Sequence, residues 1–240
     1  MDLGLFIAAS GMVAEQTRQD QLSNDLANAS TPGYKPDATP QQSFGEILLR
    51  NSATGRTIGS LNTGVALGKT YTDMAPAGMQ STGEPLDFGI VGTGFFGVQT
   101  PEGTRYTRDG QFTTSAQGLL VTATGQNVLN QSGTPIKVAA DGTVPASALG
   151  VFNVPGAVKQ GENLFAGTAA TGASGAGGSS GALGTVRQGV LEESGVNPTT
   201  AMVEMVGSLR TFQSGQQAIQ AIDQTLQAAA TQVGSMNGSS

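Results

Sequence analysis

The chain has 240 residues with a net charge of −6, includes 36 glycines and no cysteine or histidine, and only 12% of its residues are charged. Its basic residues are spread along the chain, which disfavours nucleic-acid binding because no cluster can neutralise a phosphate backbone. The composition also excludes disulfides and thiolate metal sites, and it removes the commonest general base and metal ligand, histidine.

An amphipathic helix is predicted over residues 3–29. Apolar and small residues recur there in steps of three and four, which places them on one helix face. Glu15 and Gln19 interrupt this stripe, so we expect the helix to be weak alone. The apolar run at the start follows Asp2, and the first basic residue is Arg18, so the basic start of a cleaved secretory signal is missing. The run is also too short to predict a membrane span. The stripe consists of Leu5, Ala8, Met12, Glu15, Gln19, Leu22, Leu26 and Ala29.

The sequence NDLANASTPGYKP, residues 24–36, predicts that this helix ends in a turn. Pro32 and Gly33 break helices, and Pro36 keeps the backbone extended. Tyr34 and Lys35 are interpreted either as a small anchor, whose ring packs where the chain leaves the helix, or as a plain helix exit. The exit turn is assigned to Asn28, Thr31, Pro32, Gly33 and Tyr34.

The middle of the chain changes character twice. Residues 34–85 show no persistent period and are predicted to form an extended or irregular connection. From Leu86 onward, apolar residues alternate and turn signals recur at short spacing, which predicts an antiparallel β domain over 86–190. Within it, residues 166–184 are almost entirely Gly, Ala, Ser and Thr, and such a segment is expected to form a mobile surface loop.

A second long helix is predicted at the end of the chain, within a return segment and helix over 191–240. Asn197 can cap it and Pro198 suits its first turn. Gly11, Gly207 and Gly215 lie inside the two helices, where glycine is unfavourable. Their presence is explained either by sequence drift on an exposed face or by close approach of helices in an assembly. The second stripe consists of Met202, Met205, Leu209, Phe212, Gln216, Ile219, Ile222, Leu226 and Ala229.

The predicted fold class is therefore α+β, with two long terminal helices and an antiparallel β domain inserted between them. The predicted domains are the N-terminal helix of a discontinuous helical domain at 1–33, the connecting region at 34–85, the β domain at 86–190, and the returning helical segment at 191–240.

Two glycine-rich motifs resemble nucleotide-binding signatures, and we discount both. Residues 92–97, GTGFFG, match a dinucleotide fingerprint, but a strand pattern follows where a helix should begin, so we expect a hairpin connection. Residues 68–70, GKT, resemble the end of a P-loop that lacks its first glycine and its helix. We therefore expect no cofactor.

The charged residues suggest no catalytic or metal site. Glu192 and Glu193 would point apart in a strand and are interpreted as solvated charges. Asp87, Arg105, Arg108 and Asp109 are expected to pair or to cap turns rather than to catalyse.

Four stretches carry a resemblance to a known family. They are IAASGMVAEQ at 7–16, LSNDLANASTPGYK at 22–35, LDFGIVGTGFFGVQTPEGTRYTRDGQFTTSAQGLLVTATGQNVL at 86–129, and VRQGVLEESGVNPTTAMVEMVGSLRTFQ at 186–213. Together they resemble the bacterial flagellar axial proteins, the family of rod and hook subunits. One departure is Gly195, where family members commonly have asparagine, and it affects the turn into the last helix.

The resemblance implies a structural subunit without enzymatic activity. In that family the terminal helices pair as a coiled coil and line a hollow helical polymer, a drive shaft that transmits torque for motility. Its subunits are exported unfolded across the cytoplasmic membrane through the flagellar export apparatus, without a cleaved signal, and reside in the basal body. The implied partners are further copies of the chain, other rod and hook subunits and the export apparatus, with surrounding ring proteins as a further candidate.

The short β region favours a rod subunit over a hook protein, and overall likeness favours the distal-rod type slightly over the proximal. A secreted β-rich adhesin or binding module is the main alternative, and an enzyme is a third. The coiled-coil and polymer interface is assigned to Leu5, Met12, Leu22, Leu26, Met202, Met205, Leu209, Phe212, Ile219, Ile222 and Leu226.

Overall fold

The computed structural model describes residues 2–43, 45–50, 57–62, 64–161, 163–167 and 184–237. Its chain forms two compact units. The helical unit comprises Met1–Leu26, Asp37–Tyr71 and Pro198–Ser240, and the β unit comprises Ala27–Pro36 and Thr72–Asn197. The predicted loop over 166–184 lies, except at its ends, outside the described residues.

Two long helices dominate the helical unit, α1 at Asp2–Ala27 and α2 at Pro198–Asn237. Both predicted helices are confirmed. Proline at the first position of α2 suits a helix start, because the amide it lacks would have no partner inside the helix. Neither described helix is both long and apolar enough to cross a membrane.

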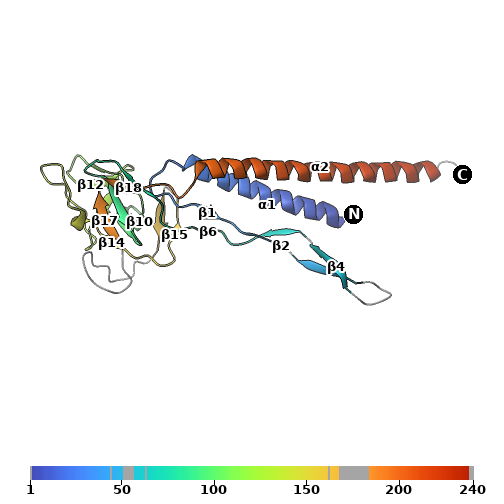
Figure 1. Cartoon of the computed structure of the whole chain (residues 1–240), viewed down its shortest axis with the longest axis horizontal. Coiled ribbons are helices and arrows are strands. Elements are labelled where there is room, and N and C mark those ends of the chain that lie inside the picture. The colour runs from blue at the N-terminus through green and yellow to red at the C-terminus, as the bar shows by residue number, and fades with distance from the viewer. Residues whose placement is uncertain are drawn as a thin grey trace. The chain divides into compact units, whose positions relative to one another are not determined.

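The helices lie side by side and run in opposite directions (Figure 1). Near one end of the pair, a Cβ placed on Gly4 would lie 3.8 Å from the Cδ1 atom of Ile222. Further along, the Ser208 hydroxyl donates to the Glu15 carboxylate at 2.6 Å. Because α1 residues of rising number meet α2 residues of falling number, the packing is antiparallel.

A narrow ribbon of short strands follows α1. The strand β2 (Gln41–Ser43) pairs antiparallel with β5 (Val65–Leu67), and β3 (Glu46–Arg50) with β4 (Thr57–Asn62). At its base, β1 (Asp37–Ala38) pairs with β6 (Tyr71–Thr72). The sequence indicates only an extended or irregular connection here, because strands this short show no sustained alternation of apolar and polar residues.

The predicted antiparallel β domain is confirmed in the β unit. Its main sheet has eight strands in the order β11-β12-β13-β9-β10-β16-β15, with β14 also pairing with β9. These strands are β9 (Phe95–Thr100), β10 (Gly103–Thr107), β11 (Phe112–Thr114), β12 (Leu120–Thr122), β13 (Asn127–Leu129), β14 (Val151–Phe152), β15 (Val158–Lys159) and β16 (Leu164–Ala166), and a short 3-10 helix, η1, spans Ala146–Ala148.

Two further strand pairs close the β unit. The strand β8 (Phe88–Val91) pairs with β17 (Thr185–Gln188), and β7 (Met79–Ser81) pairs with β18 (Val190–Glu192). The hairpin predicted for GTGFFG is therefore wrong, since β8 and β9 belong to different sheets. Gly92 and Gly94 instead make a connection with φ values of 115° and 118°, which residues with a side chain rarely adopt.

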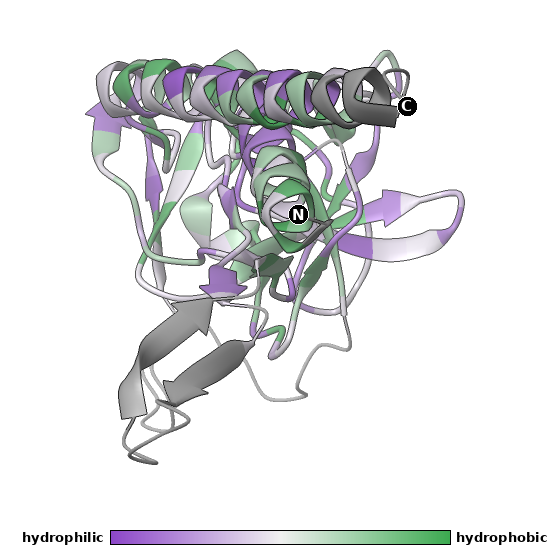
Figure 2. Cartoon of the chain, turned by 90° about the vertical axis from the view of Figure 1, so that its right-hand side faces the viewer, coloured by the Kyte–Doolittle hydropathy of each residue, from purple (hydrophilic) through white to green (hydrophobic). Residues whose placement is uncertain are grey.

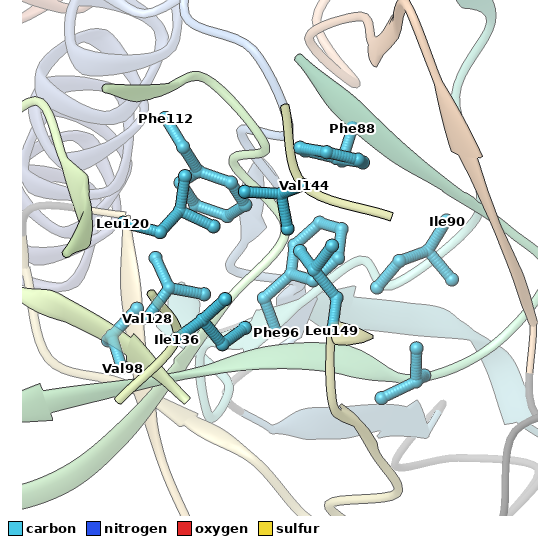
Figure 3. Packing of buried hydrophobic residues seen from close by; sticks show 11 residues of the cluster. Phe88, Ile90, Phe96, Val98, Phe112, Leu120, Val128, Ile136, Val144 and Leu149 are labelled. Atoms are coloured by element: carbon cyan, nitrogen blue, oxygen red, sulfur yellow. The ribbon is translucent and has the colours of Figure 1, made fainter. Parts of the chain in front are cut away.

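The main core lies on one face of β9, where Phe96 and Val98 are fully buried (Figure 3). The Phe96 ring meets the Phe112 ring edge-on at 5.3 Å, a favoured aromatic geometry. Because side chains alternate along a strand, Phe95 points to the other face and joins a second cluster. The main cluster contains Phe88, Ile90, Phe96, Val98, Phe112, Leu120, Val128, Ile136, Val144, Leu149 and Val151.

We expect Leu120→Ala to lower the free energy of unfolding of the β unit by about 2–5 kcal/mol, because it removes a fully buried side chain and leaves a cavity. Urea denaturation followed by circular dichroism measures this. The control Val158→Ala removes a side chain that is 64% exposed, and we expect a change within about 0.5 kcal/mol. Equal losses in the two variants would contradict this core assignment.

Candidate functional site

The contact between α1 and α2 is the first candidate site. On α2 the residues shielded from solvent follow steps of four and three, which is the spacing of a helix-packing seam. They are Ala201, Met205, Ser208, Phe212, Gly215, Ile219 and Ile222. Of these, Met205, Phe212, Ile219 and Ile222 belong to the predicted stripe, whereas Ala201, Ser208 and Gly215 do not.

The remaining predicted stripe residues are less enclosed. On α2, Met202 is 53% exposed and Leu209 is 45% exposed, and Leu226 is also exposed. On α1, Leu5 is exposed, whereas Met12, Leu22 and Leu26 are partly buried. The seam within this chain is therefore offset by one residue from part of the predicted stripe, and that part faces outward.

Small residues at every seventh position bring the two helices close. Ala201, Ser208 and Gly215 follow this spacing along α2. A Cβ placed on Gly215 would lie 2.8 Å from the Cγ of Met12, whereas one on Gly207 would meet nothing within 4 Å. Close helix approach thus explains Gly215 within the chain itself, and the space beside Gly207 is open.

Polar contacts also join the helices. The Ser208 hydroxyl approaches the Glu15 carbonyl oxygen at 3.2 Å as well as its carboxylate. Glu15, which interrupts the predicted stripe, therefore has a partner in α2. The Arg18–Glu204 ion pair at 3.2 Å has both side chains nearly half exposed, so it contributes little to stability.

The helical unit also leaves large apolar side chains uncovered. In Figure 2, hydrophobic and hydrophilic residues alternate along α2. A single exposed apolar residue is normal on a protein surface. Many of them along two neighbouring helices are typical of a surface that binds another protein. The exposed set is Leu3, Leu5, Phe6 and Val13 on α1, and Met202, Val203, Val206, Leu209 and Leu226 on α2.

We expect Gly207→Ala to raise the thermal stability of the helix pair, by up to about 1 kcal/mol, because alanine is the better helix former and its methyl group meets open space. Gly215→Ala should fail to give this gain, since its Cβ would press against Met12. Thermal melts followed at 222 nm compare the two substitutions. An equal gain for both would show that the helices do not approach closely at Gly215.

The second candidate site is the helix exit, which lies in the β unit. The Thr31 amide donates to the Asn28 carbonyl oxygen at 3.0 Å and closes a turn. Gly33 has a φ of 65°, and a Cβ there would lie 2.4 Å from the backbone carbon of Arg108. Only glycine fits this position, because both the backbone angle and the space exclude a side chain.

Side chains of the β unit hold the exit turn in place. The Asn163 amide donates to the Pro32 carbonyl oxygen at 2.9 Å. The Lys159 ammonium donates to the Lys35 carbonyl oxygen at 2.8 Å and lies 4.0 Å from the centre of the Tyr34 ring, a cation–π contact. Tyr34 is buried, as the anchor interpretation of this residue predicts.

A buried charge triad lies beside the exit turn. The Lys35 ammonium is 2.6 Å from Glu192 Oε1, and Arg108 Nη1 is 3.0 Å from Glu192 Oε2. The prediction that Glu192 is a solvated charge is therefore wrong, whereas Glu193 is exposed as expected. Residues 157 positions apart form the first pair, so no local pattern could have identified it.

Two aspartates lie close together near this site. Burial raises the pKa of Asp109, the neighbouring charge of Asp87 raises it further, and a hydrogen bond from the Gln111 amide opposes both effects. The ionised form of Asp109 is thus less favourable in the folded protein than in the unfolded chain.

We expect Asp109→Asn to raise the free energy of unfolding at neutral pH, because it removes a partly buried charge that folding disfavours. The gain should shrink as the pH falls through the raised pKa toward 3.8, the ordinary value, since Asp109 then becomes protonated in both states. Asp141→Asn is the matched contrast, because hydrogen bonds from Thr143 lower the pKa of Asp141. That substitution should give a small loss at neutral pH. Urea titrations at several pH values measure both effects, and a pH-independent gain for Asp109→Asn would contradict the assignment.

The described residues offer little for catalysis or metal binding. Among them, no group of three or more acidic, histidine or cysteine side chains could hold a metal ion. The GKT segment at 68–70 lies between β5 and β6 and precedes no helix, so it lacks the geometry of a phosphate cradle. Within the helical unit, a cavity of about 330 Å³ is lined mainly by polar residues, including the paired Arg18 and Glu204.

Comparison with known proteins covers both helices and the sheet. A family model described as flagella basal body rod protein matches residues 5–35. The flagellar hook protein FlgE/F/G D1 domain matches 89–151, and the flagellar basal body rod FlgEFG protein C-terminal model matches 187–232.

Several curated proteins are similar over nearly their whole length. The flagellar basal-body rod protein FlgG of Bacillus subtilis (strain 168) is 32% identical, covering 93% of this chain and 96% of the relative. The flagellar hook-basal body complex protein FlhO of the same organism is also 32% identical, covering 96% and 98%. The flagellar basal-body rod protein FlgF of Mesorhizobium japonicum is 30% identical, covering 89% and 90%.

Proposed function

Because the chain belongs to the family of flagellar basal-body rod proteins, we infer that it is a structural subunit of the rod in the bacterial flagellar basal body, where it serves motility. Such a subunit acts mechanically, through stiffness and through contacts with its neighbours. The observation that carries this role in the structure is the exposed apolar surface on α1 and α2, which a free monomer would leave in water.

We propose that α1 and α2 pair as a coiled coil and that their outer faces bind further copies of the chain. The antiparallel packing and the seven-residue spacing of Ala201, Ser208 and Gly215 support the pairing. Contacts between different faces of successive copies would build an open helical polymer rather than a closed ring. The residues proposed for these interfaces are Leu5, Met12, Leu22, Leu26, Met202, Met205, Leu209, Phe212, Ile219, Ile222 and Leu226.

This proposal also assigns a role to each segment of the chain. Residues 1–33 and 191–240 would supply the helical tube and its bore, residues 34–85 the connection, and residues 86–190 the outer domain. The exit turn from Asn28 to Tyr34 would lead the chain from the tube to the β domain. The proposed partners are further copies, other rod and hook subunits, the export apparatus and surrounding ring proteins, and no enzymatic activity is proposed.

Mass spectrometry of basal bodies extracted from the native cells tests the proposed function. We expect the chain at a stoichiometry comparable to that of other axial subunits, and cross-links to its neighbours would locate it along the rod, where we favour a distal position. Recovery of the chain only from the cell surface or the cytosol would overturn the proposal.

The double substitution Met202→Asp and Leu209→Asp tests the polymer interface. Both side chains are about half exposed, so the monomer should keep its helix content. Incorporation into basal bodies should fall about tenfold or more, because burying unpaired carboxylates in an interface is costly. Cells carrying the variant should lose motility.

Val158→Asp is the control for this experiment. It places the same charge on an exposed apolar residue of the β unit, and we expect it to leave incorporation and motility unchanged. Normal incorporation of the Met202/Leu209 variant would contradict the assigned interface, while the rod function itself would still rest on the composition of the basal bodies.

A further inference from the structure

Two segments of the β unit join it to the helices along the chain, and they bind each other. The outgoing connection, Ala27–Pro36, begins at the last residue of α1, and the returning connection, residues 192–197, runs from the last residue of β18 to the start of α2. The Gly33 amide donates to the Glu192 carbonyl oxygen at 2.8 Å, and the Gly195 amide donates to the Tyr34 carbonyl oxygen at 2.9 Å. Each connection therefore donates one backbone hydrogen bond to the other.

Glu192 gathers donors from several segments at one buried point. Its Oε1 accepts from the Lys35 ammonium at 2.6 Å and from the Ala77 amide at 3.0 Å, while Oε2 accepts from Arg108 at 3.0 Å. The side chains of Lys35 and Glu192 are both 1% exposed. A single carboxylate thus holds the outgoing connection, the segment before β7 and the loop after β10 together.

The two cations depend on this carboxylate to different degrees. Arg108 also donates to the Gly92 carbonyl oxygen at 2.8 Å and lies over the Phe95 ring. Apart from Glu192, the Lys35 ammonium donates to the Ala75 carbonyl oxygen at 2.7 Å, which carries no full charge. A buried cation without its anion is strongly unfavourable, so Lys35 would leave its site if Glu192 could not bind it.

The hydrophobic clusters of the β unit are built from other residues. Neither the cluster around Phe96 nor the one around Phe95 contains a residue of the outgoing or the returning connection. Opening the contacts around Glu192 therefore need not disturb either cluster, and a region of this kind can open locally while the core stays folded.

We propose that Glu192 is the positioning residue of a latch, through which the outgoing connection docks on the β unit only when the returning connection is in place. The two connections close and release together, as one cooperative element separate from the hydrophobic core. This proposal concerns the isolated chain and does not depend on the rod function.

Hydrogen exchange of the full-length monomer carrying Glu192→Gln tests the latch. We expect the amides of Gly33, Ala77 and Gly195 to exchange at least about tenfold faster than in the unchanged protein, because breaking a buried ion pair is strongly destabilising. The amides of Val98 and Val128, in the core strands, should keep their protection. Glu193→Gln is the matched control, since it makes the same chemical change at the exposed neighbour and should leave all these rates unchanged.

Lys35→Met provides a second and milder variant, which leaves Glu192 paired with Arg108. It should speed exchange at Gly33 and also at Gly195, although Gly195 lies in the other connection. Added to Glu192→Gln, it should restore part of the lost protection by removing the unpaired cation. The latch is refuted if exchange changes only at Gly33, if core and connections lose protection equally, or if neither substitution changes the rates.

Discussion

Two helices packed side by side can cover only one face of each other, and in this chain the uncovered faces carry large apolar side chains. Val203 and Val13 are more than half exposed, although burying such a side chain stabilises a protein by about 1.5–3 kcal/mol. The seam between α1 and α2 is narrow, since small residues and glycine occupy alternate positions of it. The pair therefore leaves apolar surface exposed within this chain, which suits a subunit of a larger assembly.

The β unit differs from the helices, because it buries its large apolar residues within itself. Phe95 and Phe96 point to opposite faces of β9 and enter two clusters, so both faces of the central strand are covered. Three phenylalanines, Phe88, Phe96 and Phe112, contribute rings to the main cluster. A unit with this packing can fold before any neighbour binds, whereas long helices gain most of their stability from packing against other elements.

The sequence predicts the periodic parts of this protein well and its long-range contacts poorly. The spacing of apolar residues identifies both helices, and alternation with turn signals identifies the β domain. Small residues such as Ser208 and Gly215 carry no hydrophobic signal, so their place in the seam could not be recognised. Glu192 looks like a surface charge because its partner Lys35 is distant in sequence, and the assigned interface residues await the experiments on assembly.

The distance along the chain between Lys35 and Glu192 also bears on synthesis. The carboxylate that pairs with Lys35 is translated 157 residues after it, so Lys35 lacks this partner while the intervening residues are made. The segment around Gly33 meanwhile lacks the carbonyl group that accepts its amide. The outgoing connection can therefore be fixed in its native place only after residue 192 has been made, and until then it stays accessible to water and to other molecules.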